Sequence, residues 1–170
     1  MVLIAPGIYR ESVLVTTPFI TIRGLDRNGV VIDGGFDRAI GFHVIEADGV
    51  TIENLTVRNH LLDGVRWTSV HGYWGSFLTA VNNGDHGVFA EDSDWGQIDR
   101  SYASGSPDSG FSIGQCSPCH AVVRDVLAEH NAIGFSGTNA GGDLAIVNSE
   151  WRRNLAGIVP NTSDRESGPP

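Results

Sequence analysis

Three acidic side chains and one imidazole stand just before glycines that recur along the chain at a nearly constant interval. They are Asp63, Asp85, His86 and Asp108. Two carboxyl groups a few ångströms apart can act as general acid and general base, and a nearby imidazole can move a proton or hold one of them in place. These four residues form the candidate catalytic group, provided that the fold stacks the repeat units in register.

The glycine spacing predicts such stacking. A glycine followed by a large apolar residue occurs six times, in steps of 23, 23, 23, 24 and 23 residues. A fixed period of this size is typical of repeat proteins, in which each unit buries its apolar side only against the next. The pairs are Gly41-Phe42, Gly64-Val65, Gly87-Val88, Gly110-Phe111, Gly134-Phe135 and Gly157-Ile158.

Within each unit the pattern predicts two strands. The residue after the glycine and the residue two further on are mostly apolar, with a polar or mixed residue between them, as in Phe42-His43-Val44. This alternation predicts a strand with one buried face. A polar column follows five residues after the glycine, and it suits a turn: Glu46, Ser69, Asp92, Gln115, Asn139 and Thr162. The second strand should point inward at Val57, Val81, Ala103, Ala128 and Trp151.

We therefore predict an all-β chain that folds as a right-handed parallel β-helix of about six to seven coils. Residues 1–163 should form one domain, and 164–170 a disordered, solvated tail. Neither end shows a capping unit, which indicates a fragment of a longer solenoid. We expect the uncapped ends to favour self-association.

Composition narrows the set of partners. The chain has 170 residues, a net charge of −9, a pI near 4.9 and 41% hydrophobic residues. Without a basic run it should bind neither nucleic acid nor anionic membranes. Apolar runs fall short of a membrane span. The N-terminus lacks the pattern of a signal peptide, so localisation stays open.

The segment Cys116-Ser117-Pro118-Cys119-His120 matches the C-x-x-C-H pattern of haem attachment. Its place between two strands of a packed solenoid offers no haem pocket, so we do not expect haem. One histidine and two cysteines also fall short of a zinc site. A corner closed by a disulfide, or one that holds two thiols, is the expectation.

Four acidic residues lie close together in sequence: Glu91, Asp92, Asp94 and Asp99. They could hold Ca²⁺, or they could form a solvated acidic turn, which the absence of an EF-hand spacing favours.

Exposed aromatic side chains could stack on sugar rings. Trp67 and Trp151 fall in core columns, which leaves Trp74, Trp95 and Tyr73 as candidate ligand-binding residues.

Several segments resemble a known family. The opening "VLIAPGIYRESVLV" with "ITIRG" resembles the entry segment of the pectin-lyase-like superfamily, and the glycine repeats resemble its β-helix coils. The stretches "GSPDSGFSIGQCSPC", "GTNAGG" and "GIVPNT" resemble bacterial right-handed β-helix repeat proteins, some described as nitrous-oxide-reductase accessory-like. The resemblance implies the β-helix fold and an exported or cell-surface parent, but it leaves the activity open because this scaffold hosts many functions.

Polygalacturonases of that superfamily carry catalytic Asp and His residues before such glycines. Here "LLDG", which ends at Gly64, keeps the Asp, and "DHG", which ends at Gly87, keeps the His. The adjacent Asp pair and the R-I-K of that family are missing. Two rungs would separate Asp63 from Asp108 by about 9.6 Å, close to the spacing in an inverting hydrolase.

Two functions follow from these observations. The first is a non-catalytic β-helix module that binds carbohydrate or belongs to a cell surface, in which the acidic residues are ordinary turn residues. The second is a polysaccharide-active enzyme that uses Asp63, Asp85, His86 and Asp108. The sequence favours the module. Its negative charge disfavours a lyase acting on polyuronates relative to action on neutral glycans.

Overall fold

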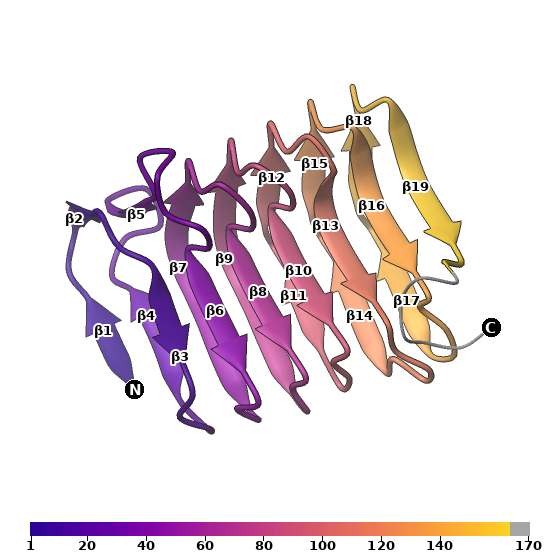
Figure 1. Cartoon of the computed structure of the whole chain (residues 1–170), viewed down its shortest axis with the longest axis horizontal. Coiled ribbons are helices and arrows are strands. Elements are labelled where there is room, and N and C mark those ends of the chain that lie inside the picture. The colour runs from indigo at the N-terminus through magenta and orange to yellow at the C-terminus, as the bar shows by residue number, and fades with distance from the viewer. Residues whose placement is uncertain (164–170) are drawn as a thin grey trace.

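The computed structural model describes residues 1–163, and in this range it contains strands and no helix (Figure 1). The strands are parallel and wind into a solenoid, which confirms the predicted fold class. One sheet has seven strands, one from each coil. They are β3 (Val13–Val15), β6 (Phe42–Ile45), β8 (Val65–Thr68), β10 (Val88–Glu91), β13 (Ser109–Gly114), β16 (Ile133–Thr138) and β19 (Ala156–Asn161). The tail predicted at 164–170 lies outside the described residues.

The other sheet has twelve strands and forms the remaining sides of the solenoid. Two of them, β7 and β9, are long enough to pair with two columns of shorter strands. The strands are β1 (Val2–Ile4), β2 (Gly7–Tyr9), β4 (Thr21–Gly24), β5 (Val30–Asp33), β7 (Val50–Arg58), β9 (Tyr73–Val81), β11 (Gln97–Asp99), β12 (Tyr102–Ser104), β14 (Ala121–Arg124), β15 (Leu127–Glu129), β17 (Leu144–Val147) and β18 (Glu150–Arg152).

Glycine recurs at this position because a side chain would not fit between neighbouring coils. A β-carbon on Gly64 would lie 2.5 Å from the carbonyl oxygen of Gly87, and one on Gly87 would lie equally close to that of Gly110. Such a distance is far inside van der Waals contact, so any side chain here would push neighbouring coils apart. The repeat therefore marks a line along which neighbouring coils leave no room for a side chain.

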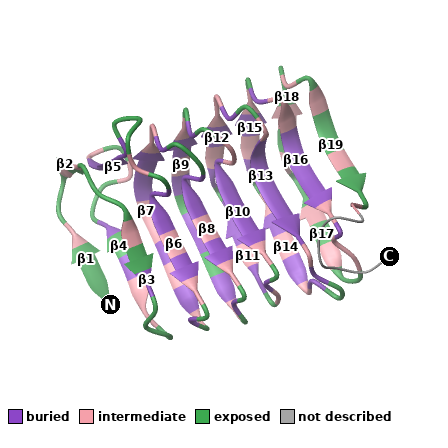
Figure 2. Ribbon diagram, in the orientation of Figure 1, coloured by how far each residue is buried: buried purple, intermediate pink, exposed green. Residues whose placement is uncertain are grey.

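The residues after these glycines form the predicted stack. Phe42, Val65, Val88, Phe111 and Phe135 pair in register from coil to coil, and all five are buried. Ile158 continues the register but is 47% exposed, because no further coil of the described chain covers it. Figure 2 shows the same gradient, with buried residues in the middle coils and exposed ones on the strands at both ends.

The second inward column differs from the prediction at one position. Val57, Ala80, Ala103 and Ala128 share a register and are fully buried, whereas Val81 lies one residue off the column. The prediction of Val81 was wrong because the inward column keeps the 23-residue period, which leads from Val57 to Ala80. Asn54 in β7 (φ 56°) and Phe77 in β9 (φ 51°) are both left-handed, so the alternation shifts at the same place in both strands and the register is kept. The column ends at Trp151, which is partly buried against the core.

The predicted turn column lies where the seven-stranded sheet ends. Five of its six members, all but Thr162, have positive φ values: Glu46 (48°), Ser69 (55°), Asp92 (47°), Gln115 (53°) and Asn139 (51°). Short polar side chains tolerate this conformation and can bond across the turn. The Ser69 hydroxyl, for example, donates to the Asp92 carboxylate of the next coil over 2.8 Å.

Candidate active site

Asp63 is the buried centre of the site. It lies in the turn before β8 and is 0% exposed. One carboxylate oxygen accepts hydrogen bonds from the backbone N–H of His86 (3.2 Å) and from its ring Nδ1 (2.8 Å). The other oxygen accepts a bond of 3.1 Å from Arg66 Nη1. Asp63 therefore fixes the position of His86 on the next coil and binds Arg66 on the same coil.

The bond to Asp63 sets the proton arrangement on His86. A carboxylate only accepts hydrogen bonds, so Nδ1 carries the proton and Nε2 is the atom left for further chemistry. Nε2 lies 3.9 Å from Asp108 Oδ1, and Nδ1 lies 3.5 Å from Asp85 Oδ2. Burial alone would lower the pKa of His86, but the bond to Asp63 and the charges of Asp63, Asp85 and Asp108 raise it above its ordinary value.

The two outer carboxylates differ from Asp63 in exposure. The side chain of Asp85 is 42% exposed and that of Asp108 is 47% exposed. Successive backbone hydrogen bonds place them one rung apart, about 4.8 Å along the solenoid. Partial burial and the charges of Asp63 and Asp108 raise the pKa of Asp85, although His86 opposes this. A carboxyl group with a raised pKa can keep a proton closer to neutral pH and donate it.

An aromatic ring and an ion pair complete one wall. The Phe89 ring stacks on the His86 ring with centroids 4.5 Å apart, and the Arg66 guanidinium lies 5.1 Å from the Phe89 centroid. Arg66 also donates two hydrogen bonds to Glu91, one of them from Nε over 3.2 Å. The Phe89 ring therefore packs against the face of the imidazole, while Asp63 bonds to its edge at Nδ1.

These groups line a cavity of about 420 Å³ on the outer face of the seven-stranded sheet. Beyond the residues already named, hydroxyl and amide groups extend it across the next two strands: Ser112, Gln115, Ser136 and Thr138. The cavity size falls within the range of small-ligand sites. Three carboxylates line it beside one arginine and one histidine, and buried Asp63 lies behind them. The cavity is therefore acidic and suits a neutral ligand better than an anionic one.

The structure brings together all four predicted residues but changes the role of one. An acid–base pair of Asp63 and Asp108 on a single open face was expected, and the complete burial of Asp63 contradicts this. Asp85 and Asp108 are the accessible carboxylates. Within residues 1–163 neither accepts a hydrogen bond from a turn amide, so the ordinary turn role does not explain them.

Sequence reasoning missed Arg66, Phe89 and Glu91. They lie on the outward side of β8 and β10, and Arg66 and Phe89 are paired in register. The signal was the polar or mixed residue between the two apolar columns, which the alternation marks as facing away from the core. In a solenoid with a groove on this sheet, that outward column is the floor.

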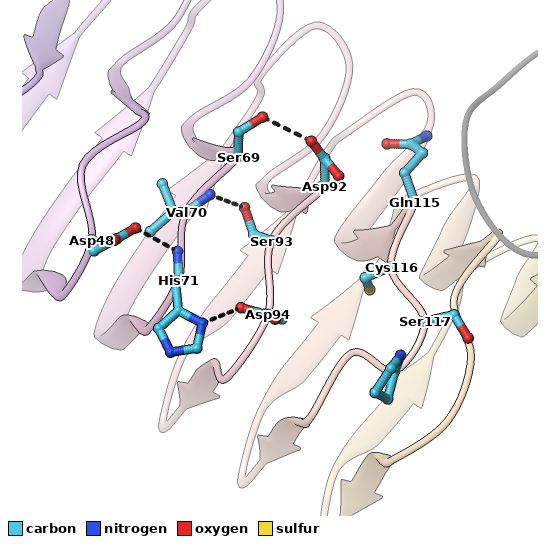
Figure 3. A pocket seen from close by; sticks show the side chains of 11 residues that line it. Asp48, Ser69, Val70, His71, Asp92, Ser93, Asp94, Gln115, Cys116 and Ser117 are labelled. Carbon is cyan, nitrogen blue, oxygen red and sulfur yellow. Dashed lines mark hydrogen bonds and ion pairs between the residues drawn. The ribbon is translucent and has the colours of Figure 1, made fainter.

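The acidic run near residue 92 does not converge on one point. Glu91 binds Arg66, while Asp92 and Asp94 bind Ser69 and His71 at the corner after β10 (Figure 3). Asp99 is buried on β11. In the described part of the chain, the one group of three or more residues close enough to share a metal ion is Asp63, Asp85 and His86. Both oxygens of Asp63 are already bonded there.

The other sequence candidates fall at one corner. Trp74 and Trp95 are 44% and 59% exposed. Tyr73 was expected at the surface, but it is 2% exposed and packs on Trp67 with ring centroids 5.5 Å apart, because neighbouring residues of β9 point to opposite faces. Cys116 and Cys119 form a disulfide.

No protein-family model matches the sequence, and comparison with curated proteins finds no match. Solved structures do resemble the fold. A protein described as a glycosyl hydrolase from Parabacteroides merdae has a TM-score of 0.58 at 10% identity, over 93% of this chain and 78% of that one. The catalytic domain of GH87 α-1,3-glucanase, in complex with nigerose, has a TM-score of 0.55 at 11% identity.

The match to the glucanase covers 86% of this chain and 40% of that one. Identities this low show a shared fold and nothing finer. They confirm the β-helix architecture that the family resemblance implied, whereas the nitrous-oxide-reductase accessory-like group stays a prediction. Among residues 1–163, no helix has the length and apolar character needed to cross a membrane.

Proposed function

We propose that the chain is a polysaccharide-active hydrolase whose groove on the seven-stranded sheet cleaves a neutral glycan. The observation that carries the proposal is the pair of accessible carboxylates, Asp85 and Asp108, on either side of a histidine that buried Asp63 holds in place. Burial of an acid is costly unless it is paired and hydrogen-bonded. Here the buried carboxylate of Asp63 is hydrogen-bonded, and its bond to His86 orients that imidazole.

The chemistry follows from the two environments. Asp85, with its raised pKa, donates its proton to the glycosidic oxygen as the bond from that oxygen to the anomeric carbon breaks. The Asp108 carboxylate, one rung away, bonds to the anomeric carbon as the leaving oxygen takes that proton. Water then displaces Asp108 from the sugar while the Asp85 carboxylate takes the proton of the water, which is the retaining route that a spacing of about one rung fits. His86 lies between the two carboxylates, 3.5 Å from Asp85 and 3.9 Å from Asp108, and helps to position them.

The fold neighbours are consistent with this proposal. The two structures above are described as a glycosyl hydrolase and a glucanase, which indicates that this scaffold can carry glycan hydrolysis. At 10% and 11% identity they do not assign an activity to this chain.

The proposal is tested by incubating the protein with neutral α- and β-glucans and with polygalacturonate, and measuring released reducing ends. We expect cleavage of a neutral glucan, and a loss of about 10²-fold or more in Asp85→Asn and in Asp108→Asn. Asp125→Asn, the same charge change on the opposite corner, should leave the rate unchanged. Equal rates in all four proteins, or no cleavage of any glucan, would contradict the proposal.

The non-catalytic carbohydrate-binding module remains the competing proposal. The accessible tryptophans at the other corner favour it, since they can bind sugar without any acid–base pair. A protein that binds glucans but cuts none would support this second function.

A further inference from the structure

A second cavity lies at the corner between the seven-stranded sheet and β9 and β11. It encloses about 420 Å³ and includes Trp74, Trp95, Thr51 and Gln97 among its lining residues. None of these residues belongs to the acidic groove. Two indole rings beside a hydroxyl and an amide form a surface with both apolar faces and polar edges.

The shape of this cavity follows from one column of the turn. Five residues, one from each of five consecutive coils, occupy the same place, and all have positive φ: Phe19 (55°), Gly49 (67°), Gly72 (76°), Trp95 (53°) and His120 (46°). The backbone is therefore similar on each of these five coils, and the shape of the surface here depends on the side chains alone. Aromatic residues stand on both sides of two consecutive glycines. The Phe19 ring covers Gly49, where an added β-carbon would lie 2.5 Å from it, so the notch is at Gly72.

Trp95 is the fixed wall of the notch. Its indole packs on the His120 ring with centroids 4.4 Å apart, and His120 in turn pairs with Asp143. On its other side the neighbouring rung carries Gly72, at which an added β-carbon would meet nothing closer than 3.8 Å. The His71 ring lies near the indole on that side, with centroids 6.2 Å apart and planes tilted by 56°, and Trp95 is still 59% exposed. The indole is therefore held in position by two histidine rings and keeps accessible surface for a ligand.

The floor carries an unused polar group. Tyr73 lies beneath the notch, and its phenol end is so close to Gly96 that a β-carbon there would lie 1.9 Å from the carbon that bears the hydroxyl. Within residues 1–163 the Tyr73 hydroxyl is buried and has no hydrogen-bond partner. A buried hydroxyl normally has a partner. This hydroxyl is sealed beneath Gly96, so Tyr73 supports the cavity from inside the solenoid and does not contact a molecule bound outside.

We propose that this corner cavity is a second, non-catalytic binding site for a neutral sugar ring. The C–H face of a pyranose is apolar and carries slight positive charge, so it packs well on the negative face of an indole. Its hydroxyl groups can bond with the Thr51 hydroxyl and the Gln97 amide, which line the cavity. The proposal shares only its ligand class with the proposed hydrolase, because it uses a different edge of the solenoid.

The experiment uses the Asp85→Asn/Asp108→Asn double variant, in which the groove cannot cleave the probe. Isothermal titration calorimetry with nigero-, malto- and cello-oligosaccharides measures affinity and the number of sites. We expect one of these series to bind, and Trp95→Ala in this background to weaken that binding about tenfold or to remove one site. Phe36→Ala, which also removes an exposed aromatic ring, should change neither quantity.

The conservative variant Trp95→Phe should restore most of the binding, since it keeps a ring face on the same rung. Unchanged binding in Trp95→Ala and Trp74→Ala, or no binding of any of the three series to the double variant, would overturn the proposal. Because the double variant is inactive by construction, these results do not depend on whether the wild-type groove cuts glycans.

Discussion

Two aspartates of this solenoid are fully buried, and their surroundings are different. Asp99 on β11 accepts hydrogen bonds from Gln97 (2.6 Å), Arg100 (2.8 Å) and Arg124 (3.3 Å), and also from Ser76. Burial alone would raise the pKa of Asp99, but the bonds from Arg100, Ser76 and Gln97 hold it below its ordinary value. Its single charge meets two arginines.

Asp63 has one arginine and one histidine as partners, and two further carboxylates lie around that histidine. Negative charge is therefore in excess around Asp63 and compensated around Asp99. The difference teaches that burial of an acid does not by itself indicate a site. What marks the Asp63 region is charge that the fold leaves uncompensated and open to a groove.

The largest effect is expected at the compensated acid. Asp99→Ala should lower the free energy of unfolding by about 2–3 kcal/mol, because the buried Ser76 hydroxyl loses its acceptor and the removed carboxylate leaves a gap, whereas the half-exposed arginines are solvated by water. Urea denaturation followed by circular dichroism measures this. Glucan cleavage by the protein that remains folded should be unchanged, and a stability loss below about 1 kcal/mol would contradict the structural role.

Asp63→Asn should be milder for stability and harsher for function. The amide keeps the volume and one acceptor, so we expect a loss of about 1–3 kcal/mol. The pKa of His86 should fall, since it loses the bond and the charge that raise it. Titration of the His86 ring by NMR measures the shift. An unchanged His86 pKa would show that Asp85 and Asp108 alone set it.

The pH dependence of stability should separate the two regions. The pKa of His86 is raised in the folded state, so its contribution is fully present below the unfolded value of about 6.5 and is lost as pH rises through the folded pKa. The stability difference between wild type and His86→Gln should shrink over that alkaline range. Asp99 acts at the other end, and its contribution is lost as pH falls below about 4. A constant difference between the two proteins would contradict the assignment to His86.

The smallest effect is expected outside both regions. Asp125→Asn removes a charge from an exposed corner, where the carboxylate accepts a bond from Asn148. Stability should change by no more than about 0.5 kcal/mol in thermal or urea unfolding. A larger loss would indicate that the ladders of polar side chains along the corners contribute more than the comparison of Asp63 with Asp99 assumes.

The repeat allowed much of the fold to be predicted. The glycine period placed five of the six stacked residues in the core, since in-register coils must put the same phase of the repeat on the same face. Val81 and Tyr73 were misplaced for a related reason. Alternation predicts the face only while the strand is regular, and the left-handed Phe77 interrupts it within β9, where the 23-residue step from Val57 would have given Ala80. The side on which β9 begins is likewise not visible in the alternation.

The candidate site was predictable as a location but not as a mechanism. Residues before the glycines had to converge, which brought Asp63, Asp85, His86 and Asp108 together. Whether a residue in that turn points into the solenoid depends on side-chain packing. The burial of Asp63 and the contribution of Phe89 therefore became clear only from the three-dimensional arrangement.

The left-handed corner that carries Phe19, Gly49, Gly72, Trp95 and His120 has a consequence for how such a chain can change. Since glycine, tryptophan, phenylalanine and histidine all occupy this place on the same backbone, one residue can be exchanged for another there without rebuilding a coil. Exchanging Gly72 and Trp95 should move the notch by one coil, about 4.8 Å along the solenoid. The proposed sugar-binding position should move with it.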